Sequence, residues 1–121
     1  MININGKEYG FMMTVGASVQ ICKVCPEHKL DKLGDALKGE YDEIVENVIT
    51  IICALNGGYV ASEALMGREA PRLTREMLYA LPPDDFAKLQ DIMISTIAKD
   101  GKGEIRAKPK KGKKDATAAT D

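Results

Sequence analysis

Apolar and polar residues alternate over the first part of the chain, which is the pattern of a β-strand. The pair Asn5-Gly6 interrupts this alternation and is preferred in a type I′ two-residue turn, where both positions need positive φ. A hairpin closed at this turn pairs Ile2 with Tyr9. One face of the hairpin then carries the side chains of Ile2, Ile4, Tyr9, Phe11, Met13 and Val15. Because a two-stranded hairpin is marginal alone, we expect helices or a neighbouring subunit to cover this face.

Further along the chain the apolar positions recur every three to four residues, which is the spacing of one helix face. We expect a short helix over residues 17–25, and Pro26 should open a second helix as its first residue. The second helix ends at Gly39. Its apolar stripe consists of Leu30, Leu33 and Leu37.

The strongest helical pattern covers residues 41–55. Its acidic first turn suits the positive end of the helix dipole. Asn56-Gly57-Gly58 supplies a left-handed stop directly after it. We therefore expect a central core helix that is too short and too polar to span a bilayer. Its shared apolar face consists of Tyr41, Ile44, Val45, Val48, Ile49, Ile52 and Leu55.

Three shorter helices are expected in the rest of the chain. The first covers residues 59–66, and the second is a brief helix capped by Thr74. The last helix starts after Pro82-Pro83 and ends at Gly101. Its apolar stripe consists of Phe86, Leu89, Ile92, Met93 and Ile97.

These patterns together predict an α+β fold that is mainly α-helical. An N-terminal β-hairpin is followed by five to six short helices in a single globular domain over residues 1–100. A disordered, Lys-rich tail covers residues 101–121, where little is left to bury. The chain has 121 residues, 45% of them hydrophobic, which suffices for one core. Since only 5% are aromatic, this core should be aliphatic.

Charge is distributed unevenly between the predicted domain and the tail. Residues 99–121 carry eight basic and four acidic side chains, a net charge of +4, and residues 1–98 carry nine basic and fourteen acidic ones, a net charge of −5. A basic tail of this kind binds nucleic-acid phosphates or an acidic protein partner, or is simply solvated. Phosphate binding would be salt-sensitive and independent of sequence. The candidate contact residues are Lys108, Lys110, Lys111, Lys113 and Lys114.

Cys22, Cys25 and His28 form a C-x2-C-x2-H motif, the one spacing in the chain that suggests a metal or redox site. A structural zinc site needs four ligands, and no second pair of this kind follows. We therefore expect buried cysteines on a helix and an exposed His28, with no metal bound. The chain also shows no signature of a nucleophile beside its single histidine. We expect no catalytic residues, no cofactor and no enzymatic activity.

Four methionines are candidates for an adaptable surface that binds partner proteins: Met12, Met13, Met66 and Met77. Ordinary core filling explains the same residues equally well, and the sequence leaves both interpretations open.

The N-terminus lacks a basic flank and an apolar run, and three cysteines do not make a disulfide framework. We therefore expect a cytoplasmic protein without a membrane segment.

Two stretches of this chain resemble a known family. INGKEYGFMMTVGA places a hairpin directly before a helix, LPPDDFAKLQDIM opens a late amphipathic helix, and a Lys/Gly/Pro tail follows. This order resembles the small tail assembly chaperones of long-tailed bacteriophages and prophages. The resemblance implies a non-enzymatic protein of the bacterial host cytoplasm that binds the tape-measure protein, recruits tail-tube subunits and self-associates. It assigns no binding residue. The alternative function is a small nucleic-acid-associated protein that binds through its basic tail.

Overall fold

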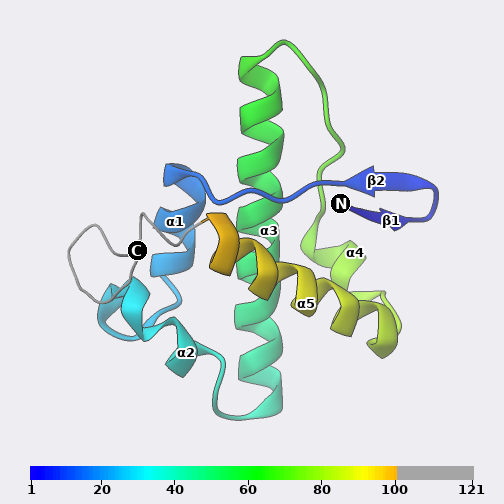
Figure 1. The fold of residues 1–121 in the computed structure, drawn as a ribbon. Helices are drawn as coiled ribbons and strands as arrows, with labels where there is room; N and C mark the ends of the chain where they lie inside the picture. Colours follow the sequence, from blue (N-terminus) through cyan, green and yellow to red (C-terminus); the bar gives the residue numbers. More distant parts are fainter. Residues whose placement is uncertain (101–121) are drawn as a thin grey trace.

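The structure is a computed structural model that describes residues 1–100. It confirms the predicted fold class, a mainly helical α+β chain that starts with a two-stranded antiparallel hairpin (Figure 1). The predicted tail and its five candidate lysines lie outside the described residues. The elements are β1 (Ile2–Ile4), β2 (Lys7–Tyr9), α1 (Val15–Cys22), α2 (Leu33–Ala36), α3 (Tyr41–Leu65), α4 (Arg75–Tyr79) and α5 (Pro83–Asp100).

The hairpin has the predicted register, in which Ile2 pairs with Tyr9. Asn5 and Gly6 have φ values of 52° and 86°, as a type I′ turn requires. The amide of Gly6 also donates a hydrogen bond to Asn3 Oδ1 at 3.2 Å, which supports the turn locally. The turn chemistry therefore specifies the register of this hairpin, and burial of Ile4 and Tyr9 in the core adds stability to it.

The strand pattern does not continue past Tyr9, contrary to the prediction. Residues 10–14 cross α3 without a strand partner, and the amide of Met12 donates to the carbonyl of Leu55 at 3.0 Å (Figure 1). Thr14 then caps α1, because its Oγ1 accepts a hydrogen bond from the amide of Ala17 at 3.1 Å. Val15, predicted on the apolar face of the hairpin, instead begins α1 and is exposed.

The segment between α1 and α3 is less regular than the predicted second helix. Pro26 does open a helical turn, but this is a 3-10 turn, Pro26–His28. Glu27 and His28 have φ values of 57° and 55°, which a continuous helix does not permit. A second 3-10 turn, Leu30–Lys32, and the four residues of α2 complete the connection.

α3 runs unbroken through the predicted stop at Asn56-Gly57-Gly58, so the expected helices over residues 41–55 and 59–66 are one helix of 25 residues. A Cβ on Gly58 would lie 2.6 Å from the backbone oxygen of Met12, and one on Gly10 would lie 2.5 Å from the ring of Tyr59. Gly58 therefore marks a close crossing of two backbones, and Gly10 leaves room for the ring of Tyr59. Gly57 and Gly58 do not end the helix.

The core is built around α3, with α1 and α5 packed against it (Figure 1). As expected from the composition, it is aliphatic. The largest fully buried apolar side chains are Ile21, Val48, Ile49, Ile51, Ile52, Leu55, Leu89 and Met93. Tyr41, predicted on the buried face of the helix, is 80% exposed because it begins α3 beyond the packed region.

One buried polar side chain ties three segments of the chain together. Asn56 of α3 has no solvent exposure. Its amide nitrogen donates to the carbonyl of Gly10 at 3.0 Å, and its oxygen accepts from the amide of Leu73 at 2.7 Å. Asn56 therefore fixes both the crossing segment and the loop before α4 to the central helix.

α3 is also long and apolar enough to cross a membrane, so the prediction that this stretch is too short was wrong. Its most apolar 18-residue window has a mean hydropathy of 1.5, and 39% of that window is buried in the fold. The core helix of a soluble protein meets the same criterion. Length and composition alone therefore do not distinguish a core helix from a membrane span.

Candidate partner-binding groove

An open apolar groove lies where α3, α4 and α5 meet. Its volume is about 310 Å³, and the residues that line it carry no charge. α3 contributes its first turns to one wall, and the α4–α5 corner forms the other. The residues that matter most for binding are Tyr41, Ile44 and Val45 of α3, Tyr79 of α4, and Phe86 and Gln90 of α5.

Several apolar and aromatic side chains of the groove are exposed to solvent. Tyr41 is 80% exposed and Tyr79 is 55% exposed, and Ile44, Val45 and Phe86 are only half-buried. Tyrosines at such a site offer a large apolar ring and a polar end at a low cost in side-chain entropy. An exposed group of apolar residues with aromatic sides is typical of a protein-binding surface.

A polar network fixes Tyr79 at the side of the groove. Its hydroxyl donates to Glu46 Oε2, and Arg75 Nη2 donates to Glu46 Oε1. Arg75 Nη1 also donates to Thr50 Oγ1 at 2.9 Å. The hydrogen bond from Tyr79 and the guanidinium of Arg75 lower the pKa of Glu46 below its ordinary value. The network joins α4 to α3 and holds the tyrosine ring in place.

A second, larger hollow of about 550 Å³ lies between the hairpin and the α4–α5 corner. Its lining is mixed, with the apolar Ile2 and Met77 beside Asn3, Asp85 and Lys88. Lys88 and Asp85 already pair with each other at 3.8 Å. This hollow lacks the uncharged, aromatic character of the groove, so the groove is the better candidate for binding an apolar partner.

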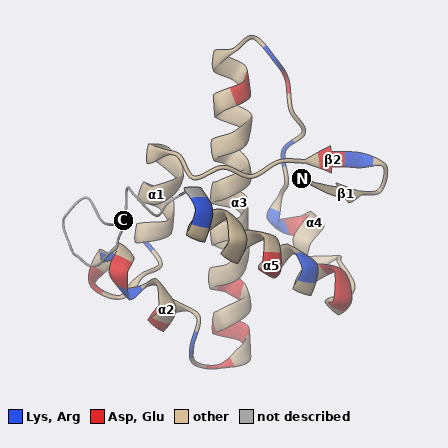
Figure 2. Cartoon of the chain, viewed as in Figure 1, with Lys and Arg blue, Asp and Glu red and all other residues tan. Residues whose placement is uncertain are grey.

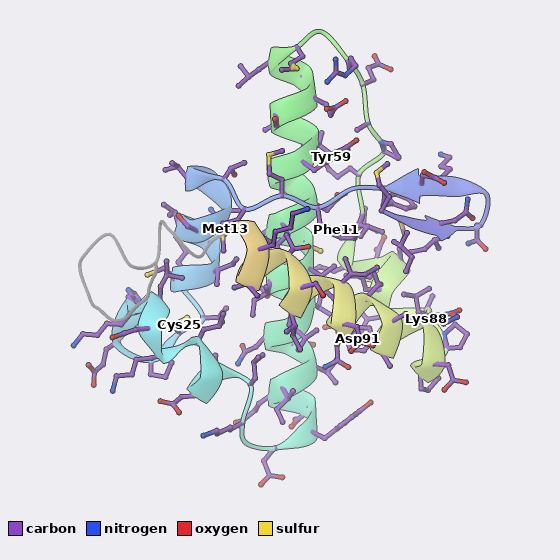
Figure 3. All side chains as sticks on the ribbon, viewed as in Figure 1. Phe11, Met13, Cys25, Tyr59, Lys88 and Asp91 are labelled. Carbon is purple, nitrogen blue, oxygen red and sulfur yellow. The ribbon has the colours of Figure 1, made fainter. Side chains whose placement is uncertain are left out.

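The four candidate methionines do not form one common surface. Met13, labelled in Figure 3, is buried in the core with 5% exposed. Met12, the preceding residue of the crossing segment, is half-buried. Met66 follows the end of α3 and is 68% exposed, and Met77 of α4 lines the second hollow. None of the four lines the groove.

The C-x2-C-x2-H motif forms no metal cluster within the part of the chain that the structure describes. Cys25 is buried, as predicted, and its thiol donates to the carbonyl of Ile21 at 3.4 Å. The prediction that both cysteines are buried on one helix was wrong, because Cys22 is half-buried at the end of α1 and Cys25 lies beyond that end. Burial raises the pKa of Cys25, which keeps the thiol protonated at neutral pH and disfavours its use as a nucleophile. His28 is exposed, and its backbone carbonyl accepts from the thiol of Cys22.

The acidic pair at the start of α3 serves the helix terminus. Asp42 Oδ1 accepts from the amide of Glu43 at 2.9 Å, and Glu43 Oε1 accepts from the amide of Glu40 at 3.4 Å. Glu40 and Glu43 thus form a capping box. These contacts agree with the predicted role in helix-terminus stabilisation.

Sequence reasoning did not find the groove. Its walls come from positions as far apart as Tyr41 and Gln90, and no local pattern joins them. The one sequence signal for the groove is the apolar stripe that begins at Tyr41. Periodicity alone predicts that this whole stripe faces the core.

Comparison with known proteins assigns neither a family nor a function to this chain. The chain matches no protein-family model, and no curated protein or solved structure matches it significantly.

Proposed function

We propose that this chain is a non-enzymatic phage tail assembly chaperone that binds the tape-measure protein and recruits tail-tube subunits. The observation that carries the proposal is the open, uncharged groove between α3, α4 and α5, with exposed Tyr41 and Tyr79 at its sides. The resemblance of the hairpin and of the last helix to this family supplies the identity of the partner.

The groove suits a chaperone because a long helical protein exposes apolar stripes that otherwise aggregate. An amphipathic helix places such a stripe into a groove of this kind. One small groove gives weak binding, which allows release when the tail tube assembles. Many copies along one long partner raise the total affinity through avidity, and self-association of the chaperone would increase this effect.

The test is co-expression of the full chain with a candidate tape-measure protein, scored by solubility and co-purification. Tyr41→Ser should reduce both, because it removes an exposed ring from the groove without disturbing the core. Leu65→Ser is the matched control, since Leu65 is 90% exposed at the opposite end of the same helix. A tape-measure protein that stays insoluble with the wild-type chaperone contradicts the proposal.

The alternative, nucleic-acid binding through the basic tail, has a separate signature. Binding to duplex DNA or RNA should disappear when residues 101–121 are deleted, and it should weaken steeply as salt rises. Tyr41→Ser should leave such binding unchanged. This pattern together with an insoluble tape-measure protein would favour the alternative.

A further inference from the structure

We infer that the groove binds one particular kind of segment, an amphipathic helix whose apolar stripe is bordered by Lys and Arg. The inference rests on the proposed function and specifies which part of a long helical partner is recognised. The uncharged groove lies between acidic borders on both α3 and α5, and this combination supports it.

The first border is on α3. Successive residues of a helix are separated by about 100°, so Asp42 and Glu46 lie on the flank next to the groove residues Tyr41, Val45 and Ile49. The hydrogen bond from Tyr79 to Glu46 places this carboxylate beside the groove independently of the helix geometry. α3 contains no Lys or Arg, and its first turns show only acidic charge (Figure 2).

The second border is at the start of α5, on the other wall. Asp84 follows the groove residue Pro83, and Asp91 follows the groove residue Gln90. Asp84 is exposed at this end of the groove. Asp91 lies on the same helix flank, about 20° away by helix periodicity, but it lines a different hollow with Met1 and Phe11. Figure 3 shows Asp91 and Lys88 on α5. Asp91 shares its hollow with Lys99, which partly balances its charge.

Two cations near the groove are already paired within the protein. Arg75 donates to Glu46 and Thr50, and Lys88 lies 3.8 Å from Asp85. Asp42 and Asp84 therefore leave negative charge on both sides of an apolar floor. A helix with basic residues beside its apolar stripe complements this pattern, whereas acidic residues at those positions would be repelled.

Segments of this same chain fit the groove poorly. Residues 101–121 are basic, but Ile105 is their only large apolar residue, so they lack an apolar stripe. α1 exposes Val15 and Val19, yet it contains no Lys or Arg. The occupant that fits is therefore a segment of another protein.

The test uses three synthetic 18-residue peptides and the full chain, with binding measured by fluorescence anisotropy. The first peptide has a Leu stripe of helical spacing bordered by Lys, the second replaces each Lys with Glu, and the third scrambles the first. We expect the Lys peptide to bind at least about tenfold more tightly than the Glu peptide at low salt. The difference should shrink as salt screens the exposed charges, and the scrambled peptide should not bind.

Variants of the protein test whether the peptide binds in the groove and whether the acidic residues beside the groove select its charge. Tyr41→Ser should weaken binding of the Lys peptide, and Leu65→Ser should not. The double variant Asp42→Asn, Asp84→Asn should weaken binding of the Lys peptide and strengthen binding of the Glu peptide. Circular dichroism shows whether each variant keeps its helices.

The outcomes separate this inference from the proposed function. Equal binding of the Lys and Glu peptides, or no binding of either, overturns the inference even when the tape-measure protein co-purifies. Charge-selective binding that depends on Tyr41 supports the inference even when the tape-measure protein stays insoluble, in which case only the proposed function fails.

Discussion

At the scale of single residues, a few polar side chains decide how the apolar segments are arranged. Asn56 is fully buried and bonds to backbone groups of two other segments, at Gly10 and at Leu73. Glu46 and Tyr79 make the equivalent connection at the surface, between α3 and α4. Apolar contacts are not directional, so these hydrogen bonds determine which groups meet.

Asn56→Ala should destabilise the protein strongly. The substitution leaves the buried amide of Leu73 and the carbonyl of Gly10 without their partner, and we expect a loss of about 3 kcal/mol in the free energy of unfolding. Urea denaturation followed by circular dichroism measures this loss. Asn47→Ala is the control, because half-buried Asn47 makes one bond to the carbonyl of Ala36 and should cost about 1 kcal/mol. Equal losses for the two variants would contradict this role of Asn56.

Tyr79→Phe should raise the pKa of Glu46 towards its ordinary value. In the folded protein this pKa is lowered, chiefly by the hydrogen bond from Tyr79. The Glu46 carboxylate therefore stabilises the fold above the unfolded-state pKa, and this contribution is lost as pH falls through the folded-state pKa. NMR titration of the side-chain carboxyl carbons measures the shift. Glu63, whose pKa is lowered by Arg68, should be unchanged.

At the scale of elements, α3 departs furthest from the expectation. Local chemistry at Asn56-Gly57-Gly58 favours a helix end, yet the helix continues to Leu65. The crossing of residues 10–14 accounts for the difference. Because Gly58 has no side chain, the backbone of Met12 can approach α3 closely. The side chain of Asn56 bonds to Gly10, the first residue of the crossing segment.

Two adjacent alanine substitutions test this explanation. Gly58→Ala should destabilise the protein by about 1–3 kcal/mol, because its Cβ would lie 2.6 Å from a backbone oxygen that cannot move freely. Gly57→Ala should stabilise it by about 0.5–1 kcal/mol through higher helix propensity. The nearest atom to the Gly57 Cβ is Arg72 Nη1, at an ordinary 3.5 Å. Thermal denaturation of both variants gives the comparison, and stabilisation by Gly58→Ala would rule out a close crossing.

At the scale of the whole molecule, residues 4–93 contain every buried side chain described in the core. The core holds α1, α5 and the crossing segment on α3, and the groove remains open on the side where α4 meets α5. The domain and the basic tail should therefore act separately, the domain through its groove and the tail through its charge.

Deletion of residues 101–121 should leave the stability of the domain almost unchanged. We expect a melting temperature within about 3 °C of the full chain, because changes away from buried features rarely exceed about 0.5 kcal/mol. Thermal circular dichroism provides the measurement. Binding of the Lys-bordered peptide should also be retained, and a large loss of either property would show that the tail is part of the folded unit.

The sequence by itself determined the features that depend on neighbouring residues. Asn5-Gly6 specified the hairpin and its register, Thr74 capped α4, and the period of apolar residues located α3 and α5. In these cases the deciding interactions are within a few residues of each other along the chain. The prediction of a mainly helical α+β fold follows from them.

Only the tertiary structure decided where distant segments meet. It extended α3 through two glycines and left Tyr41 exposed at the side of a groove. The groove itself needs Tyr41, Tyr79 and Phe86 from three helices, positioned by the Glu46 network. Such contacts depend on packing between elements, which local periodicity and turn chemistry do not encode.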